Sequence, residues 1–169
     1  MTQAIVVMGV TGSGKSTLGQ ALATALDWPF VEGDTLHPPA NIAKMAAGIP
    51  LSDADRVPFL DNVAHAIATR QTNLVISCSA LKRAYRDVLT RADPHLLFIL
   101  PDLSREDLQR RLQRRSNHFM PAALLDSQLA DLEPPQADEP ILQIDGGVPP
   151  EQQVALALAA LKRLQTREV

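Results

Sequence analysis

Near its start the chain reads Gly9-Val10-Thr11-Gly12-Ser13-Gly14-Lys15-Ser16, which is the pattern G-x-x-x-x-G-K-[ST] of a phosphate-binding loop. Its glycines let the backbone curl around an anion, because no Cβ atom stands in the way. The amide N–H groups then form a nest for phosphate oxygens. Lys15 adds a charge for the outer phosphates, and the Ser16 hydroxyl is a ligand for Mg²⁺. The predicted nucleotide-binding residues are Gly9, Val10, Thr11, Gly12, Ser13, Gly14, Lys15, Ser16 and Thr17.

The residues on either side of the loop support this interpretation. Residues 4–8 are apolar and rich in β-branched side chains, which predicts a buried parallel strand. After the loop, apolar residues recur at helical spacing, and the N-terminus of the expected helix would face the phosphates. This apolar stripe comprises Leu18, Ala21, Leu22, Ala25 and Leu26. A chance match to the loop pattern is the alternative, and the strand and helix around it argue against that.

The composition of the 169-residue chain favours one domain that spans residues 1–169. Hydrophobic residues make up 46% of the chain, enough for a packed core. A net charge of −3 gives no electrostatic reason to expect nucleic acid or an anionic membrane as a partner. The single cysteine, Cys78, fits a reducing compartment. Since neither a signal peptide nor a membrane-spanning stretch is found, we expect a cytoplasmic protein.

Predicted strands and helices alternate along the chain. The strands are expected at residues 4–8, 28–32, 73–78, 96–100 and 141–145, and the helices at residues 18–26, 37–45, 52–68, 79–92, 104–115, after residue 121 and from residue 149 onward. In the helix at 52–68, the expected buried stripe is Val57, Leu60, Val63, Ala64, Ile67 and Ala68. This alternation predicts an α/β fold with a five-stranded parallel sheet and helices on both faces.

In such sheets, ligands bind beyond the carboxyl ends of the strands. The phosphate-binding loop and residues 32–34, 77–79 and 101–102 should therefore converge on one cleft. Two longer connections, at about residues 37–50 and 111–135, are candidates for a substrate cap and a lid.

Two acidic residues follow the second predicted strand. Asp34 is the candidate general base, which would take the proton from a substrate hydroxyl as that hydroxyl attacks the γ-phosphate. Glu32 lies two residues earlier, so on a strand it would share a side with Asp34, and it is a candidate for holding a water of the Mg²⁺ shell. The alternative is that both are turn residues.

Three basic residues are candidates for binding an anionic substrate. Arg56 lies on the apolar side of its helix and needs a carboxylate partner there, which an ion pair with Asp53 or Asp55 would also supply. Lys82 and Arg86 follow the third strand, and a solvated face is the alternative for both.

One short helix carries five arginines: Arg105, Arg110, Arg111, Arg114 and Arg115. Pairs at i, i+4 such as Arg111 and Arg115 repel each other unless an anion lies nearby. We therefore expect Arg111 and Arg115 to be catalytic lid arginines that neutralise charge in a phosphoryl-transfer transition state. A basic outer face is the alternative for Arg105, Arg110 and Arg114.

Two of the four histidines, His37 and His118, lie in the expected cap and lid and are candidates for donating hydrogen bonds to a substrate or to the nucleotide. No His/Cys cluster has the spacing of a metal site. Cys78 is expected to be a small core residue rather than a nucleophile.

Several stretches beyond the loop are distinctive: Gly33-Asp34-Thr35-Leu36-His37-Pro38, Asn41-Ile42-Ala43-Lys44-Met45, Gly48-Ile49-Pro50-Leu51, Asp53-Ala54-Asp55-Arg56, Cys78-Ser79-Ala80-Leu81-Lys82 and His118-Phe119-Met120. In these stretches, and in their order, the chain resembles the bacterial gluconate kinase family. The resemblance implies a three-layer P-loop kinase fold with a helical lid, ATP and Mg²⁺ as cofactors, phosphorylation of D-gluconate at its terminal hydroxyl, and a homodimer. A polyol acid needs a base, a carboxylate clamp and hydroxyl partners, and the candidates above supply these groups.

Two other functions stay open at this point. The first is another small P-loop kinase, acting on shikimate, a nucleoside monophosphate or adenylylsulfate; an aromatic content of only 4% counts against a nucleotide acceptor. The second is a nucleotide-binding module without transferase activity. A switch GTPase would normally carry an Asn-Lys-x-Asp motif, which this sequence lacks.

Overall fold

The centre of the fold is a parallel sheet whose strand order is β2-β3-β1-β4-β5. The computed structural model describes residues 2–114 and 122–166. The strands are β1 (Ala4–Val7), β2 (Phe30–Glu32), β3 (Leu74–Ser77), β4 (Leu97–Asp102) and β5 (Ile141–Asp145). All the pairings are parallel, and β1 lies between β3 and β4. The five-stranded parallel sheet predicted from the sequence is therefore confirmed.

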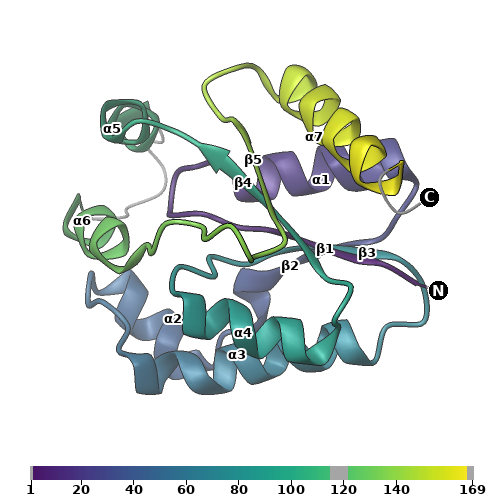
Figure 1. Cartoon of the computed structure of the whole chain (residues 1–169). Helices are drawn as coiled ribbons and strands as arrows, with labels where there is room; N and C mark the ends of the chain where they lie inside the picture. The colour runs from purple at the N-terminus through teal and green to yellow at the C-terminus, as the bar shows by residue number, and fades with distance from the viewer. Residues whose placement is uncertain (1, 115–121, 167–169) are drawn as a thin grey trace.

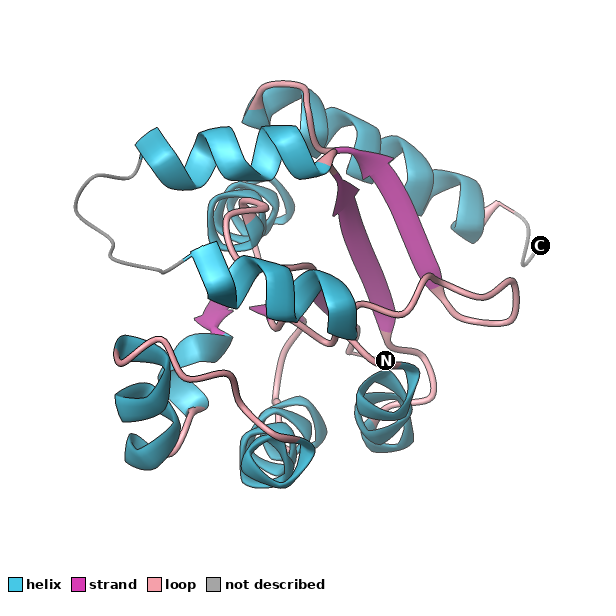
Figure 2. Ribbon diagram, turned by 90° about the vertical axis from the view of Figure 1, so that its left-hand side faces the viewer, coloured by secondary structure: helices cyan, strands magenta, loops and turns pink. Residues whose placement is uncertain are grey.

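Helices cover both faces of this sheet (Figures 1 and 2). In chain order they are α1 (Lys15–Leu26), the short 3-10 helix η1 (Gly33–Leu36), α2 (Pro39–Ala46), α3 (Asp53–Ala68), α4 (Arg83–Ala92), α5 (Arg105–Arg114), α6 (Ala122–Asp131) and α7 (Pro150–Gln165). One face carries α1 and α7, and the opposite face carries α3 and α4. The helices α5 and α6 lie beyond the carboxyl ends of the strands (Figure 1).

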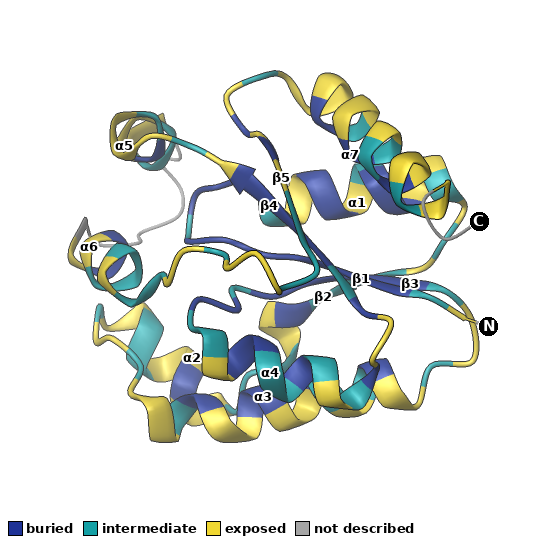
Figure 3. Cartoon of the chain, viewed as in Figure 1, coloured by how far each residue is buried: buried dark blue, intermediate teal, exposed yellow. Residues whose placement is uncertain are grey.

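The strands alternate their side chains between two hydrophobic layers. Ile5 and Val7 of β1 pack in the layer that includes α1 and α7, while Ala4 and Val6 pack in the layer that includes α3 and α4. All four are fully buried, and Figure 3 shows the central strands as the most buried part of the chain. Burial on both faces explains why β1 is a continuous apolar run.

Two helices differ from the sequence-based prediction. The helix α4 begins at Arg83 instead of residue 79, because residues 78–82 form a loop in which Ala80 adopts a positive φ of 45°. In α3, Val57 is 56% exposed and Ala68 is also exposed, so their predicted burial was wrong. Phe59 lies on the buried face instead, which comprises Arg56, Phe59, Leu60, Val63 and Ile67.

The first helix shows a smaller shift of the same kind. Its buried residues are Leu18, Gly19, Leu22 and Ala23, whereas Ala25, predicted to be buried, is exposed. None of the described helices is both long and apolar enough to cross a membrane.

Candidate active site

The phosphate-binding loop connects the end of β1 to the start of α1, as predicted. Gly12 and Gly14 have φ values of 77° and 86°, a left-handed conformation that residues with a Cβ atom rarely adopt. Gly14 is the N-cap of α1, and no side chain caps this helix end. The first N–H groups of α1 are therefore available for an anion, which the helix dipole also favours.

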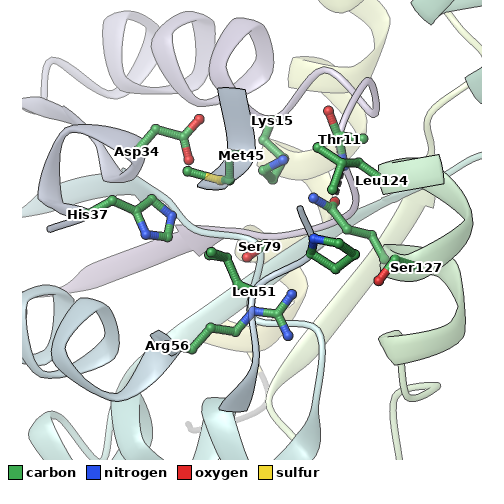
Figure 4. Close-up of a pocket in the computed structure, with 12 residues that line it drawn as sticks. Thr11, Lys15, Asp34, His37, Met45, Leu51, Arg56, Ser79, Leu124 and Ser127 are labelled. Atoms are coloured by element: carbon green, nitrogen blue, oxygen red, sulfur yellow. Dashed lines mark hydrogen bonds between the residues drawn. The ribbon is translucent and has the colours of Figure 1, made fainter. Parts of the chain in front are cut away.

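A pocket opens beside this loop, and its lining comes from segments far apart in the sequence (Figure 4). The lining comprises Thr11, Lys15, Asp34, His37, Met45, Pro50, Leu51, Arg56, Ser79, Leu124, Ser127 and Gln128. The fold thus brings together five of the predicted site residues: Thr11, Lys15, Asp34, His37 and Arg56. Figure 4 shows their side chains around one space.

The position of Asp34 depends on a tight contact between β2 and β3. The Gly33 N–H donates to Ser77 Oγ (3.0 Å), and that hydroxyl donates to Glu32 Oε1 (2.5 Å). A Cβ atom on Gly33 would lie 1.8 Å from the Ser77 carbonyl oxygen, so only glycine fits here. The chain therefore turns into η1 directly after Glu32, and Asp34 reaches the pocket from η1.

This turn corrects one expectation. Because β2 ends at Glu32 and Asp34 belongs to η1, the two carboxylates do not share the side of a strand. Asp34 is exposed and lines the pocket, whereas Glu32 is half-buried, bound to Ser77, and not part of the lining.

His37 is held by an aromatic ring and an amide. Its ring stacks on Phe59, with the centroids 3.6 Å apart and an angle of 12° between the planes. Asn41 Nδ2 lies 3.3 Å from His37 Nδ1 and also donates to the Asp55 carbonyl. Burial lowers the pKa of His37 below its usual 6.5, and the Arg56 charge lowers it further, while Asp34 opposes this. With Asn41 as the donor, the neutral ring carries its proton on Nε2.

Arg56 has a carboxylate partner, although a different one from either candidate considered above. Its Nη1 donates to Asp131 Oδ2 on α6 (2.9 Å) and to the Tyr85 hydroxyl (3.1 Å). Burial alone would lower the pKa of Arg56, but the bonds to Tyr85 and Asp131 outweigh it, so the pKa is raised. Asp53 instead accepts from Lys82 (2.9 Å) and from the Tyr85 hydroxyl.

Lys82 and Arg86 do not line the pocket. Lys82 pairs with Asp53 at the surface. The Arg86 side chain is only 1% exposed, and its Nε lies 2.6 Å from Glu139 Oε1. Its Nη1 also donates to the carbonyls of Ala80 and Leu81. The expectation that Arg86 binds substrate does not fit this burial; Arg86 instead holds the loop before α4.

Among the lid arginines, Arg111 lies against the phosphate-binding loop. Its Nη1 donates to the Ser13 carbonyl (3.3 Å) and its Nη2 to the Gly146 carbonyl (2.6 Å). A Cβ atom on Gly14 would lie 3.2 Å from Arg111 Nη1. The exposed Arg105 and Arg110 pair with Asp126 and Asp107. Arg115 and His118 lie outside the described residues.

Sequence reasoning missed two residues of α6 that reach this site. The Thr11 N–H of the loop donates to Gln128 Oε1 (2.6 Å), and Asp131 accepts from Arg56. Both lie more than 70 positions from their partners, so no local pattern could have found them.

Comparisons with known proteins agree with this geometry. The AAA domain family matches residues 5–135. A gluconokinase of Gluconobacter oxydans (strain 621H) is 51% identical over 146 residues, covering 84% of this chain and 82% of that protein. The thermosensitive gluconokinase of Escherichia coli (strain K12) is 46% identical over 147 residues, with coverages of 85% and 79%. A crystal structure of a gluconokinase from Sinorhizobium meliloti 1021 superposes with a TM-score of 0.90 at 47% identity and covers 96% of this chain and 93% of that one.

Proposed function

This chain belongs to the gluconokinase family, and from that premise we propose that it transfers the terminal phosphoryl group of ATP to the terminal hydroxyl of D-gluconate. The observation that carries the proposal is that Lys15, Asp34 and Arg56 line one pocket. They supply a cation for the outer phosphates, a carboxylate for the attacking hydroxyl and a guanidinium for an acid group. These are the groups that phosphorylation of a sugar acid requires.

On the acceptor side, Arg56 is the proposed carboxylate clamp. It uses Nη1 for Tyr85 and Asp131, which leaves its Nε and Nη2 donors for a bidentate bond to a carboxylate. His37 would donate its Nε2 proton to a substrate hydroxyl, and Asp34 would take the proton of the attacking hydroxyl. We leave Lys82 and Arg86 out of this proposed site, because both are paired outside the pocket.

On the nucleotide side, the N–H groups of residues 9–17 would bind the phosphates, and Lys15 would stabilise the outer ones. Arg111 would bring positive charge to the phosphoryl group in transit, since it already contacts the loop at Ser13. We extend the same role to Arg115 from the sequence alone.

The donor groups beside the loop fit Mg²⁺. The exposed Ser16 hydroxyl is at the start of α1, and Glu32 keeps one carboxylate oxygen on Ser77 while the other would accept from a metal-bound water. Within the described ranges, no group of three or more His, Cys, Asp or Glu side chains could hold a metal ion by itself. This suits Mg²⁺, which is bound largely through substrate phosphates and water. When bound, the ion would neutralise phosphate charge.

The surroundings of the pocket give the remaining parts of the proposal. Residues 37–50, which include α2, would form a substrate cap, and the region 111–135 would form the lid within one domain. Following the family resemblance, we also propose a cytoplasmic homodimer. Light scattering coupled to size exclusion would test the dimer, and a mass of one protomer would contradict it.

The function is tested by measuring ADP release from Mg²⁺·ATP with a panel of acceptors. The panel contains D-gluconate, shikimate, AMP, adenylylsulfate and a blank without acceptor. Strong stimulation by D-gluconate alone is expected, with one ADP formed per phosphorylated acceptor. Tight ATP binding without stimulation by D-gluconate would contradict the proposal, and stimulation by shikimate would favour the alternative kinase.

A further inference from the structure

The contact between Gln128 and Thr11 joins the lid to the phosphate-binding loop. Gln128 Oε1 accepts the Thr11 backbone N–H at 2.6 Å, across 117 positions of sequence. This N–H belongs to the group of loop amides that a phosphate would use. A neutral side-chain oxygen therefore occupies one of the donors of the predicted anion site.

The neighbours of Thr11 indicate which phosphate this donor faces. Thr11 lines the same pocket as Lys15 and Asp34 (Figure 4). Lys15 serves the outer phosphates, and Asp34 is the proposed base for the attacking hydroxyl. An oxygen that met the Thr11 N–H in this pocket would thus belong to the terminal phosphoryl group, which must lie between the loop and the acceptor.

Gln128 is held at this position by the rest of α6. Two contacts fix α6 in place. Leu125 packs in one buried cluster with Val10 of the phosphate-binding loop, and Asp131 pairs with Arg56 of α3. Leu124, Ser127 and Gln128 all line the pocket. Because the helix is fixed at both the loop and α3, the side chain of Gln128 can exchange partners without moving the backbone.

We propose that Gln128 recognises the terminal phosphoryl group of ATP through hydrogen bonds; this inference rests on the function proposed above. With ATP bound, a γ-phosphoryl oxygen accepts the Thr11 N–H in place of Gln128 Oε1. The side-chain amide of Gln128, released from Thr11, then donates from Nε2 to the same phosphoryl group. ADP lacks this group, so it leaves the Gln128–Thr11 bond intact. Gln128 thereby distinguishes substrate nucleotide from product nucleotide.

The test compares ADP with a non-hydrolysable ATP analogue, both with Mg²⁺, by calorimetric titration of the full-length protein. Gln128→Glu keeps an acceptor for Thr11 but places a negative charge where the γ-phosphate would lie. The dissociation constant of the analogue should rise about tenfold or more, and that of ADP by about threefold at most. The control is Gln109→Glu at an exposed position on α5, which introduces the same charge and should change neither dissociation constant.

An equal change for both nucleotides, or no change for either, would overturn the proposal. If Gln128→Glu does not fold, Gln128→Ala gives a second test. The dissociation constant of the analogue should rise about threefold or more, because the bond lost to the charged phosphoryl group is stronger than the neutral bond lost to Thr11, while that of ADP stays unchanged and kcat falls about tenfold. An unchanged kcat would contradict the role. The titrations need no acceptor, so their outcome is separate from whether D-gluconate is the substrate.

Discussion

Arg56 of α3 and Asp131 of α6 form an ion pair in which Nη1 lies 2.9 Å from Oδ2, with the two side chains 9% and 26% exposed. The pair joins the helix that we assign to acceptor binding to the helix that contacts the phosphate-binding loop through Gln128. Because Tyr85 holds the same nitrogen, the direction of the guanidinium is fixed from two sides. An arginine fixed in this way is preorganised for a carboxylate.

Replacing Arg56 by lysine should weaken acceptor binding. Arg56→Lys keeps the positive charge but loses the planar pair of donors, so the KM for D-gluconate should rise about tenfold to hundredfold. The KM for ATP should stay within about twofold. The matched control is Arg91→Lys at an exposed position on α4, which should leave both constants unchanged. Steady-state kinetics would decide this, and an unaltered KM for D-gluconate would place the carboxylate elsewhere.

Removing the charge of Asp34 should slow the chemical step rather than binding. Asp34→Asn preserves the shape of the side chain but leaves no base for the attacking hydroxyl, so kcat should fall by about 10²–10⁴-fold. ATP affinity should change little, because we assign Asp34 to the acceptor hydroxyl and not to the nucleotide. Single-turnover measurements with Asp61→Asn, exposed on α3, as the control would check this. Full turnover by Asp34→Asn would mean that another group takes the proton.

The sheet could be predicted from the sequence because its signals are local. The apolar run at residues 4–8 and the glycine-rich loop after it determine a strand, a turn and a helix in succession, and the structure confirms all three. The start of α4 could not be predicted in this way. Residues 79–82 have the composition of a helix, but the buried Arg86 donates to the carbonyls of Ala80 and Leu81. Leu81 also packs in one buried cluster with Val10 of the phosphate-binding loop. These tertiary contacts override local propensity.

The candidate site was predictable only where its residues follow a strand or a named motif. Lys15, Asp34 and His37 follow β1 or β2, whose carboxyl ends converge in a parallel sheet, and Arg56 belongs to the distinctive stretch Asp53-Ala54-Asp55-Arg56 at the start of α3. Arg86 was assigned to substrate because a sequence cannot show that Glu139, 53 positions away, already neutralises it. Gln128 and Asp131 were missed for the same reason: their partners are determined by how α6 packs on the loop and on α3.

Cys78 should resist thiol reagents as long as the protein is folded. Burial raises the pKa of its thiol from 9.0 to about 12, with the Ala80 N–H opposing this, and the residue is 1% exposed. At about pH 8 the native protein should react about a thousandfold more slowly than the unfolded chain. Because Cys78 is the sole cysteine of the sequence, total thiol release in denaturant is a complete control. Rapid modification of the native protein would contradict its placement in the core.

The buried pair between Arg86 and Glu139 should make stability depend on pH. Its two side chains are 1% and 4% exposed. Burial raises the pKa of Glu139, but the hydrogen bonds from Arg86 and from the Gln136 N–H, together with the charges of Arg86 and Arg83, outweigh it, so the pKa lies below the usual 4.5. A carboxyl whose pKa is lowered by folding contributes stability that is complete above its unfolded-state pKa and is lost as the pH falls through its folded-state pKa.

Glu139→Gln should therefore lower the free energy of unfolding most near neutral pH. At about pH 7 the free energy of unfolding should drop by about 3 kcal/mol, because Arg86 is left buried without its carboxylate. Below about pH 4.5 the wild type begins to lose the same contribution, so the difference between the two proteins should narrow. Urea unfolding at several pH values measures this difference. The contributions of the other carboxylates to the pH dependence cancel in it, because both proteins contain them. The exposed Glu106→Gln is the control that should show no such narrowing. A difference that stays constant as the pH falls would mean that Glu139 does not carry the charge of the pair.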